Sequence, residues 1–430
     1  MESKGNIRYR LAHRTPFFYG WIIVLAAFLG SFAGGGLQSF TFGVFIKPMS
    51  DSLGWSRAAL VGALTVRTYV SALLGPLFGR VVDQHGPRHI MAASALIGGI
   101  AALLLTQVRE LWQFYAIFAL LGLAGGTGAG ALVVQVTVVK WFVRLRGRAV
   151  ALSTMGNAAA GAILAPFVGF VIIQSGWESG WTTMAVIFLV LLLPVSLLMV
   201  RQPEDVGLFP DGAKTNEELN QTYASRSGRE SAVSWTLKEA LRTKALWLIL
   251  AAQVVGGAPV SSIVLHEFSF VTDEGFSSIL AATILSTHAV SASMARLIWG
   301  FLVERYHVRY CFAISSSGAA IGVLFLLVGL KLNFLPLLFL FAVVYGINVG
   351  GHAVLTSVVT ANYFGRDFVG TIRGTLMPIT TTSVALGPVA VGLAYDFLGS
   401  YFQAYAVMLI MFFISAIIML MAKPPTKIME

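Results

Sequence analysis

The sequence predicts an all-α membrane protein with twelve transmembrane helices in two pseudo-symmetric six-helix halves. Charged residues make up only 11% of the chain and hydrophobic residues 57%, whereas soluble domains carry about 25% charge. Apolar runs of about twenty residues, the length that a helix needs to cross a bilayer, recur along nearly the whole chain. A turn sequence near residue 80 also returns half a chain later.

Twelve segments meet the length and hydropathy that a spanning helix requires, and a helix pairs its own backbone amides inside the bilayer. The predicted spans are 17–45, 57–79, 89–108, 111–139, 149–174, 180–200, 245–268, 277–300, 310–330, 334–361, 374–398 and 401–422. We expect the first span to be retained, because the basic start lacks a small-residue cleavage site. The predicted domains are a cytoplasmic N-terminus (1–16), an N-terminal half (17–200), a linker (201–244), a C-terminal half (245–422) and a tail (423–430).

The linker is expected to be cytoplasmic and to carry one short surface helix. It opens with the Pro- and Gly-rich stretch RQPEDVGLFPDG. Near its end, Ser234 or Thr236 can cap a helix, and Glu239 would complete a capping box with Thr236. The alternative is a solvated tether that has no role in the function.

The distribution of Lys and Arg predicts that both termini are cytoplasmic. With that orientation, 23 of the 29 basic residues fall on the inner side and 4 on the outer side, as the positive-inside rule requires. The same rule accounts for the net charge of +10, so no nucleic-acid partner is expected. A single cysteine, Cys311, excludes an internal disulfide. No catalytic or metal-binding constellation is visible, and we expect neither an enzyme nor a cofactor.

The repeated turn indicates that the chain arose by duplication. Its residues are Gly79, Asp83, Gly86 and Arg88 in the first half and Gly300, Glu304 and Arg309 in the second. Gly300, Glu304 and Arg309 each follow their counterparts by 221 residues. Parallel repeats of this kind predict a substrate site near the bilayer midplane, between the halves.

The charged residues of the two turns predict a conformational latch. Asp83 is expected to pair with Arg88 or with a basic residue of the neighbouring turn, and Glu304 with Arg305 and Arg309. Such pairs would hold the outward-open state and break on inward opening. The alternative is that they are solvated surface charges worth under about 1 kcal/mol.

Two arginines, Arg67 and Arg296, lie inside predicted spans, where a charge is costly. Arg67 is about 15 and 18 Å of helix from the ends of its span, too deep for its side chain to reach the surface. Arg296 is closer to an end. All acidic residues are expected in loops, the linker or helix ends, Glu267 and Asp396 included. We therefore expect an anionic substrate to supply the missing negative charge, although Arg67 could instead be structural and bond backbone carbonyls of the eleventh span.

The loop Gly79-x-x-x-Asp83-Gln84-His85-Gly86-Pro87-Arg88 resembles the most specific motif of major facilitator superfamily transporters, and the resemblance covers essentially the whole chain. Within that superfamily, the chain is similar to the bacterial monocarboxylate transporter and oxalate/formate antiporter group. The segments that carry this similarity are Tyr19-Gly20-Trp21, PEDVGLFPDG and Arg296-Leu297-Ile298-Trp299-Gly300.

The resemblance implies that Arg296, four residues before Gly300, binds the substrate carboxylate. A guanidinium suits this task, because its planar fork binds a carboxylate with two hydrogen bonds and keeps its proton. The chain departs from animal members at Ala292, where Asp is frequent, and at Gln38 or its neighbours, where the first span of those members has Lys. The eleventh-span Lys of oxalate exchangers is also missing.

Proton coupling would require a titratable group in the transport path. His266, His288 and His352 are the candidates, with His266 and His288 the two preferred, and His288 follows Arg67 by the repeat spacing of 221 residues. Each could instead be a neutral, hydrogen-bonded core residue. The uncharged polar residues expected to line the substrate path are Gln38, Tyr115, Asn157, Asn348 and Thr381. Each of these could instead hydrogen-bond neighbouring helices.

The predicted function is secondary active transport of small organic anions, monocarboxylates such as lactate or pyruvate, by proton symport with alternating access. The protein is expected to be a monomer in the cell (inner) membrane, with the anion, the proton and lipid as its partners. One alternative is an anion exchanger for dicarboxylate- or formate-like substrates. Another is a multidrug exporter, which would usually need an acidic residue in an aromatic cavity.

Overall fold

The computed structural model of the protein describes residues 7–35, 39–127, 131–215, 217–218, 220–221 and 234–426. Over these ranges the regular structure is helical and includes no strand. The chain forms two compact units. The first comprises the described residues up to Ser234 together with Phe364–Pro378, and the second comprises Trp235–Tyr363 and the described residues from Ile379 onward. The beginning of helix α18 (Val369–Leu398) therefore packs within the first unit.

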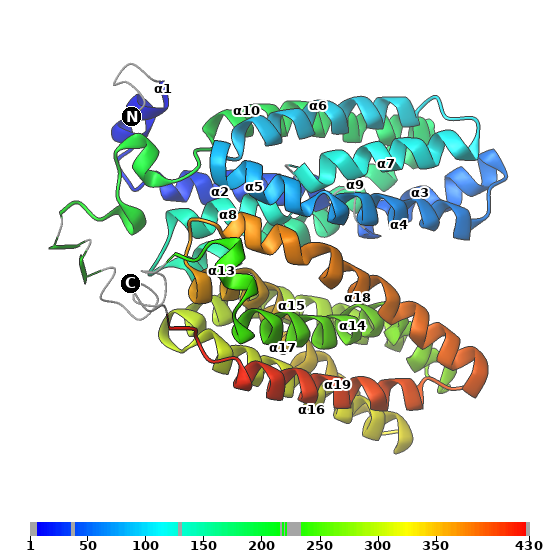
Figure 1. Ribbon diagram of the computed structural model, residues 1–430. Coiled ribbons are helices and arrows are strands. Elements are labelled where there is room, and N and C mark those ends of the chain that lie inside the picture. The colour runs from blue at the N-terminus through cyan, green and yellow to red at the C-terminus, as the bar shows by residue number, and fades with distance from the viewer. Residues whose placement is uncertain are drawn as a thin grey trace. The chain divides into compact units, whose positions relative to one another are not determined.

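The first unit is a bundle of long helices in which α2 packs on α9 and α4 packs on α7. Figure 1 shows α4, α6, α7 and α9 running alongside one another. Its elements, besides the start of α18, are α1 (Ile7–Arg14), α2 (Gly20–Gly35), α3 (Ser39–Leu53), α4 (Arg57–Leu73), α5 (Gly75–His85), α6 (Arg88–Leu105), α7 (Leu111–Thr127), α8 (Ala131–Trp141), α9 (Arg146–Ile187), the π-helix η1 (Phe188–Leu192), α10 (Leu193–Leu198) and the 3₁₀ turns η2 (Pro203–Val206) and η3 (Pro210–Gly212).

The first six predicted spans correspond to these elements. Helices α2 and α3 begin within predicted span 17–45, and α7 and α8 lie on either side of 128–130. Helices α4 and α5 are bent by 49° relative to each other. Between Arg146 and Leu198 the chain turns at Gly176, whose φ of 85° and ψ of 167° glycine adopts without a steric penalty. That turn separates predicted spans 149–174 and 180–200.

The second unit contains the remaining spans, each as one continuous helix. Its elements, besides the rest of α18, are α13 (Leu237–Leu241), α14 (Lys244–Asp273), α15 (Ser278–Arg305), α16 (Val308–Lys331), α17 (Leu335–Phe364) and α19 (Phe402–Met421). In this unit α14 and α16 both pack against α19, and α14 packs against α15. Across the described ranges, eight helices are long and apolar enough to cross a membrane, or nine if α4 and α5 form one bent span.

The two units repeat the same local turn before their second spans, which supports the predicted duplication. Gly54 and Gly275, 221 residues apart, both have positive φ, 71° and 90°. Two residues later, Ser56 caps α4 and Ser277 caps α15 with the same backbone angles, φ −65° and ψ 146°. Each serine hydroxyl accepts a hydrogen bond from the amide three residues on, at 3.2 and 3.3 Å.

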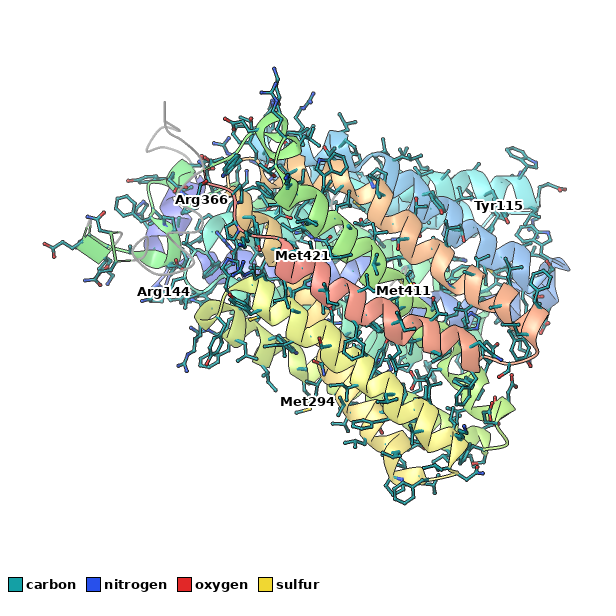
Figure 2. The ribbon with its side chains drawn as sticks, turned by 60° about the horizontal axis from the view of Figure 1, so that its bottom comes forward. Tyr115, Arg144, Met294, Arg366, Met411 and Met421 are labelled. Carbon is teal, nitrogen blue, oxygen red and sulfur yellow. The ribbon has the colours of Figure 1, made fainter. Side chains whose placement is uncertain are left out.

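The outer surfaces of the helices carry many large apolar side chains. Figure 2 shows side chains projecting along the helices, and Met294, labelled there, is 67% exposed. Leucine, isoleucine and phenylalanine are exposed on most of the long helices as well. Contiguous apolar surface of this extent is rare on a soluble monomer, and it is what helices in contact with lipid require.

The first part of the linker, residues 201–213, belongs to the first unit and is bound to its helices. The Asp211 carboxylate accepts hydrogen bonds from three successive backbone amides, those of Val143, Arg144 and Leu145, at 3.1, 2.8 and 3.1 Å. These amides precede α9, so Asp211 compensates the positive end of that helix. Arg201 pairs with Asp205 at 2.8 Å, and this hydrogen bond raises the pKa of Arg201.

The second part of the linker that the structure describes is the surface helix α13. Thr236 caps it and accepts from the Glu239 amide at 3.3 Å, and the Glu239 carboxylate accepts from the Thr236 amide at 2.7 Å. This reciprocal pair is a capping box at the residues that the sequence spacing indicated.

Candidate functional site

Arg67 lies on α4, six residues before the helix ends at Leu73, and its side chain is partly buried. The backbone at Arg67 is in close contact with α7. A Cβ added at Gly122 of α7 would lie 2.8 Å from the Arg67 carbonyl oxygen. Glycine at that position therefore lets α7 approach the segment that carries the guanidinium, and the position of Arg67 is set by tight helix packing.

Arg296 lies on α15 and is also partly buried. The helix around it is held by α17 at two points. A Cβ at Gly350 would overlap the carbonyl oxygen of Ala292, one turn before Arg296. The Trp299 indole N–H donates to the carbonyl of Ile347 at 2.9 Å. Arg296 thus projects from a rigidly held helix, which is a requirement for orienting a bound carboxylate. Its assignment to the substrate stays a prediction.

Two of the predicted lining residues use their polar groups within the helix bundles. The Tyr115 hydroxyl donates to the carbonyl of Ala59 on α4 at 2.9 Å. The Asn348 side-chain amide donates to the carbonyl of Val344 at 2.7 Å, and its side chain fills the space beside Gly318 of α16. The Tyr115 bond joins α7 to α4, whereas the Asn348 bond is within α17, and participation of both residues in substrate binding stays a prediction.

The other predicted lining residues differ in how far the structure describes them. Asn157 of α9 packs against Gly35 of α2, where a Cβ would overlap its side-chain oxygen. Thr381 lies on α18 and is partly buried. Gln38 lies outside the described residues. Participation of these three in substrate binding stays a prediction.

The latch residue Asp83 is buried at the end of α5 and has several partners. Its carboxylate lies 2.7 Å from the Lys140 ammonium, and the two side chains are 4% and 2% exposed. It also accepts from the backbone amides of Gly370 and Thr371, at 3.2 and 2.6 Å, and from the Thr371 hydroxyl at 2.8 Å. Those amides begin α18, so the carboxylate is at the positive end of a helix dipole. Arg88 or a basic residue of the neighbouring turn was predicted to pair with Asp83. Lys140 is such a residue of the neighbouring turn.

The motif glycine Gly79 brings α5 and α18 together. A Cβ at Gly79 would overlap the carbonyl oxygen of Gly370, and one at Gly75 would lie 2.7 Å from the carbonyl oxygen of Gly374. The two helices therefore touch backbone to backbone through four glycines. This contact positions Asp83, one turn beyond Gly79, at the start of α18.

The second copy of the turn is built differently. Gly300 is buried at the corresponding position of α15. The Arg309 guanidinium donates to the Tyr310 hydroxyl at 2.6 Å, and Arg305 stacks over the Phe301 ring at 4.2 Å. Aromatic partners thus take part in this turn, and the pairing predicted for Glu304 stays a prediction.

The two candidate proton carriers lie in different surroundings of the second unit. His266 is partly buried, and its Nε2 lies 3.0 Å from the carbonyl oxygen of Pro388 on α18. His288 is 4% exposed, and its Nδ1 lies 2.8 Å from the carboxylate of Glu267 on α14.

The position of Glu267 corrects the expectation that every acidic residue is near a surface. It lies six residues before the end of α14, yet its side chain is 0% exposed. The prediction was wrong because it considered distance along the helix and ignored the helix face. Ile263, Phe270 and Val271, four residues before and three and four after Glu267, are all buried, so Glu267 is on the core face. That spacing was a signal in the sequence.

The packing of two basic side chains of the first unit was also missed. Lys140, which the sequence indicated only as a basic residue of the neighbouring turn, is buried and also donates to the carbonyl of Asp367 at 3.1 Å. Arg373 of α18, counted only among the inner charges, donates to the side-chain oxygen of Gln135 on α8 at 2.9 Å. No composition signal distinguishes them from surface residues, because their burial depends on packing by α18.

The profile of the Major Facilitator Superfamily matches residues 21–286 and 260–429. The chain belongs to the major facilitator superfamily. Curated relatives of this superfamily member include the mouse monocarboxylate transporter 11, 25% identical over 399 residues that cover 90% of this chain and 84% of the relative. Another is the mouse monocarboxylate transporter 2, 21% identical over 90% of this chain and 80% of the relative. An MFS-type transporter of Gibberella moniliformis is 24% identical over 90% and 86%.

Solved structures of the superfamily share the fold. A proton:xylose symporter matches with a TM-score of 0.74 at 12% identity, covering 94% of this chain and 95% of that structure. A human organic anion transporter matches with a TM-score of 0.65 at 16% identity, covering 93% and 98%. The protein therefore has the twelve-helix major facilitator fold. It is a multi-pass membrane transporter for a small molecule and not an enzyme, as the sequence predicted.

Proposed function

We propose that this superfamily member is a secondary active transporter of small organic anions, monocarboxylates such as lactate or pyruvate, by proton symport with alternating access across the cell (inner) membrane. The observation that carries the proposal is the guanidinium of Arg296 on α15. This helix contacts α17 at Ala292, before Arg296, and at Trp299, after it. A guanidinium in a membrane helix favours an anion as ligand, and its fork matches a carboxylate. The relatives named monocarboxylate transporters support the same substrate class.

Arg67 would provide a second positive group or a gate for the anion. It is at mid-depth in α4, where only protein or a wet cavity can solvate a guanidinium. Asn157 and Thr381 are the uncharged residues that we assign to the same path.

The latch would accompany alternating access. Asp83, Lys140 and the start of α18 form a compact polar cluster that can exist in made and broken states, which a two-state transporter requires. Gly79 and Gly300 would allow the helix approach in each half, and Arg88, Glu304 and Arg309 would complete the charged turns. His266 or His288 would take part in proton coupling.

Thermal stabilisation of the purified protein by a panel of ligands tests the substrate class. A ligand at a hundredfold excess over its Kd stabilises the folded state by about 2.7 kcal/mol. We expect lactate and pyruvate to raise the Tm, and amphiphilic cations and sugars to leave it unchanged. Dicarboxylates stabilising better than monocarboxylates would contradict the assignment to monocarboxylates, and cations stabilising better than acids would contradict the whole anion class.

Variants locate the binding group. Arg296→Gln should abolish the acid-dependent Tm shift, and Arg296→Lys should restore only part of it, because lysine lacks the fork. Arg67→Gln should weaken the shift as well. Arg80→Gln is the matched control, because Arg80 is exposed on α5 and should retain the wild-type shift. Wild-type shifts in both Arg296 variants would refute the role of that residue.

A further inference from the structure

We propose that Glu267 is the group that binds the coupled proton, and that His288 is the positioning residue that holds its carboxylate. This inference rests on the proposed function, because it assigns the proton site of that symporter. It also changes the assignment made from the sequence, in which a histidine carried the proton.

The geometry joins two helices through one short contact. Glu267 of α14 and His288 of α15 are 21 residues apart, and Nδ1 of the imidazole lies 2.8 Å from one carboxylate oxygen, Oε2. The other oxygen, Oε1, is buried and has no hydrogen-bond partner among the described residues. One oxygen is therefore fixed and the other remains available to receive a proton.

The surroundings are apolar apart from two hydroxyl groups. The pair is surrounded by a cluster of buried residues that includes Ile263, Phe270 and Ile284. Tyr345 of α17 contacts the His288 ring at 4.9 Å, and Tyr405 of α19 lies near enough to Glu267 to interact with its charge. Both tyrosine hydroxyls are buried without a hydrogen-bond partner in the described part of the chain. Polar atoms left without a partner in an apolar core are costly, so a functional reason is expected for them.

The helices packed around the pair carry other ionisable side chains. α17 has His352 two turns beyond Tyr345, and its ring lies 4.9 Å from that of Phe312 on α16. α14 also carries His266, which is directed to Pro388 of α18. Tyr401 precedes α19, one turn before Tyr405, and its ring centroid lies 5.4 Å from that of His266. Helix α16 has no ionisable side chain between Phe312 and Leu330. Glu267 is thus the one carboxylate at this position among the described residues of the cluster and its neighbours.

The chemistry is the addition of one proton with nothing released. In the unprotonated form, His288 is neutral and donates its Nδ1 proton to Oε2, so the pair carries one negative charge. A solvated proton from the aqueous side then adds to Oε1, and the pair becomes neutral. A buried carboxylate is costly in an apolar interior, so the protonated form suits the closed core. The ionised form requires access of water to the pair. Proton binding is therefore linked to the conformational change that admits water.

Transport in proteoliposomes separates proton coupling from substrate binding. We measure lactate exchange at equal pH and lactate accumulation driven by an imposed proton gradient. Glu267→Gln should lower gradient-driven accumulation at least tenfold while exchange stays within twofold of wild type. Glu274→Gln is the matched control, because Glu274 is exposed at the end of the same helix and should retain both activities. Wild-type accumulation by Glu267→Gln would overturn the proposal, as would accumulation that follows a sodium gradient at constant pH.

A positioning role for His288 predicts a different effect. His288→Gln should shift the pH of half-maximal accumulation while exchange persists, because the carboxylate remains but loses its imidazole partner. An unchanged pH profile would show that His288 does not act through Glu267. Loss of accumulation in His288→Gln together with normal accumulation in Glu267→Gln would show that His288, and not Glu267, binds the coupled proton.

Infrared titration without substrate distinguishes failure of this inference from failure of the proposed function. The folded wild type should show a protonated carboxyl band that disappears as the pH rises, and Glu274→Gln should show it too. Glu267→Gln should lack the band. This result does not depend on lactate being the substrate. If Glu267→Gln does not fold, Tyr345→Phe and Tyr405→Phe provide the test. Each should move the midpoint of the carboxyl-band titration to higher pH, because each removes a polar atom beside the carboxylate. Unchanged midpoints in both would overturn the proposal.

Discussion

Neutralising Asp83 should lower the local stability of the start of α18 by about 3 kcal/mol. Its carboxylate is 4% exposed and joins an ammonium at 2.7 Å, two backbone amides and one hydroxyl. Removing one partner of a buried ion pair costs about 3–5 kcal/mol. In Asp83→Asn the remaining amide oxygen can keep one bond to Thr371, so we expect the lower end, about 3 kcal/mol.

Hydrogen exchange at the amides of Gly370 and Thr371 measures this effect directly. A loss of about 3 kcal/mol corresponds to exchange roughly 100-fold faster at these two amides. The matched control is Glu204→Gln. The Glu204–Arg366 pair is also in the first unit, but its side chains are 35% and 16% exposed, so its removal should cost under about 1 kcal/mol. Equal rates in Asp83→Asn and wild type would refute the inference that Asp83 holds the start of α18.

The remaining predictions concern packing and capping. Gly79→Ala should lower the Tm and disturb the contact with α18, at a cost of about 1–3 kcal/mol, whereas Gly43→Ala on α3, where a Cβ meets nothing within 4 Å, should be neutral or slightly stabilising. Asp211→Ala should cost about 1–2 kcal/mol and speed amide exchange before α9, because three amides lose their acceptor; slow exchange there would contradict the capping role. Thr236→Ala should fray α13 at a cost of about 1 kcal/mol, visible as faster exchange at the amide of Glu239.

The fold was predictable because its signals are long and repeated. Apolar runs mark the spans, and the 221-residue repeat marks the duplication, which the paired turns at Gly54 and Gly275 confirm. The bend between α4 and α5 and the extension of α18 to Val369 were not predicted. The start of α18 is polar in sequence, and it is helical because Asp83 and Lys140 bind it.

The candidate site was predictable only in part, because burial on a helix depends on face as well as depth. Asp83 was identified from its motif, but its partner Lys140 could be named only as a basic residue of the neighbouring turn. Glu267 was missed although its apolar neighbours at helical spacing marked a core face. The hydrogen bond from Tyr115 to Ala59 was not predicted, because nothing in the sequence links those two residues.

Arg67 and His288 occupy equivalent positions of the two halves, and their different side chains suggest different functions, anion binding and proton binding. Both backbones meet a glycine of a neighbouring helix, since a Cβ at Gly122 would lie 2.8 Å from the Arg67 carbonyl and one at Gly346 would lie 2.6 Å from that of His288. The packing is thus alike and the side chains differ.

By the same 221-residue spacing, the position equivalent to Glu267 in the first half is Ile46. At these two positions the second unit has an imidazole and a carboxylate 2.8 Å apart, whereas the first unit has an arginine and an isoleucine. A permanent cation suits an anionic substrate and a neutralisable pair suits a proton. On this basis we expect Ile46→Glu to weaken monocarboxylate stabilisation, because it places a carboxylate at the position equivalent to Glu267. An undiminished lactate-dependent Tm shift in folded Ile46→Glu would contradict this division.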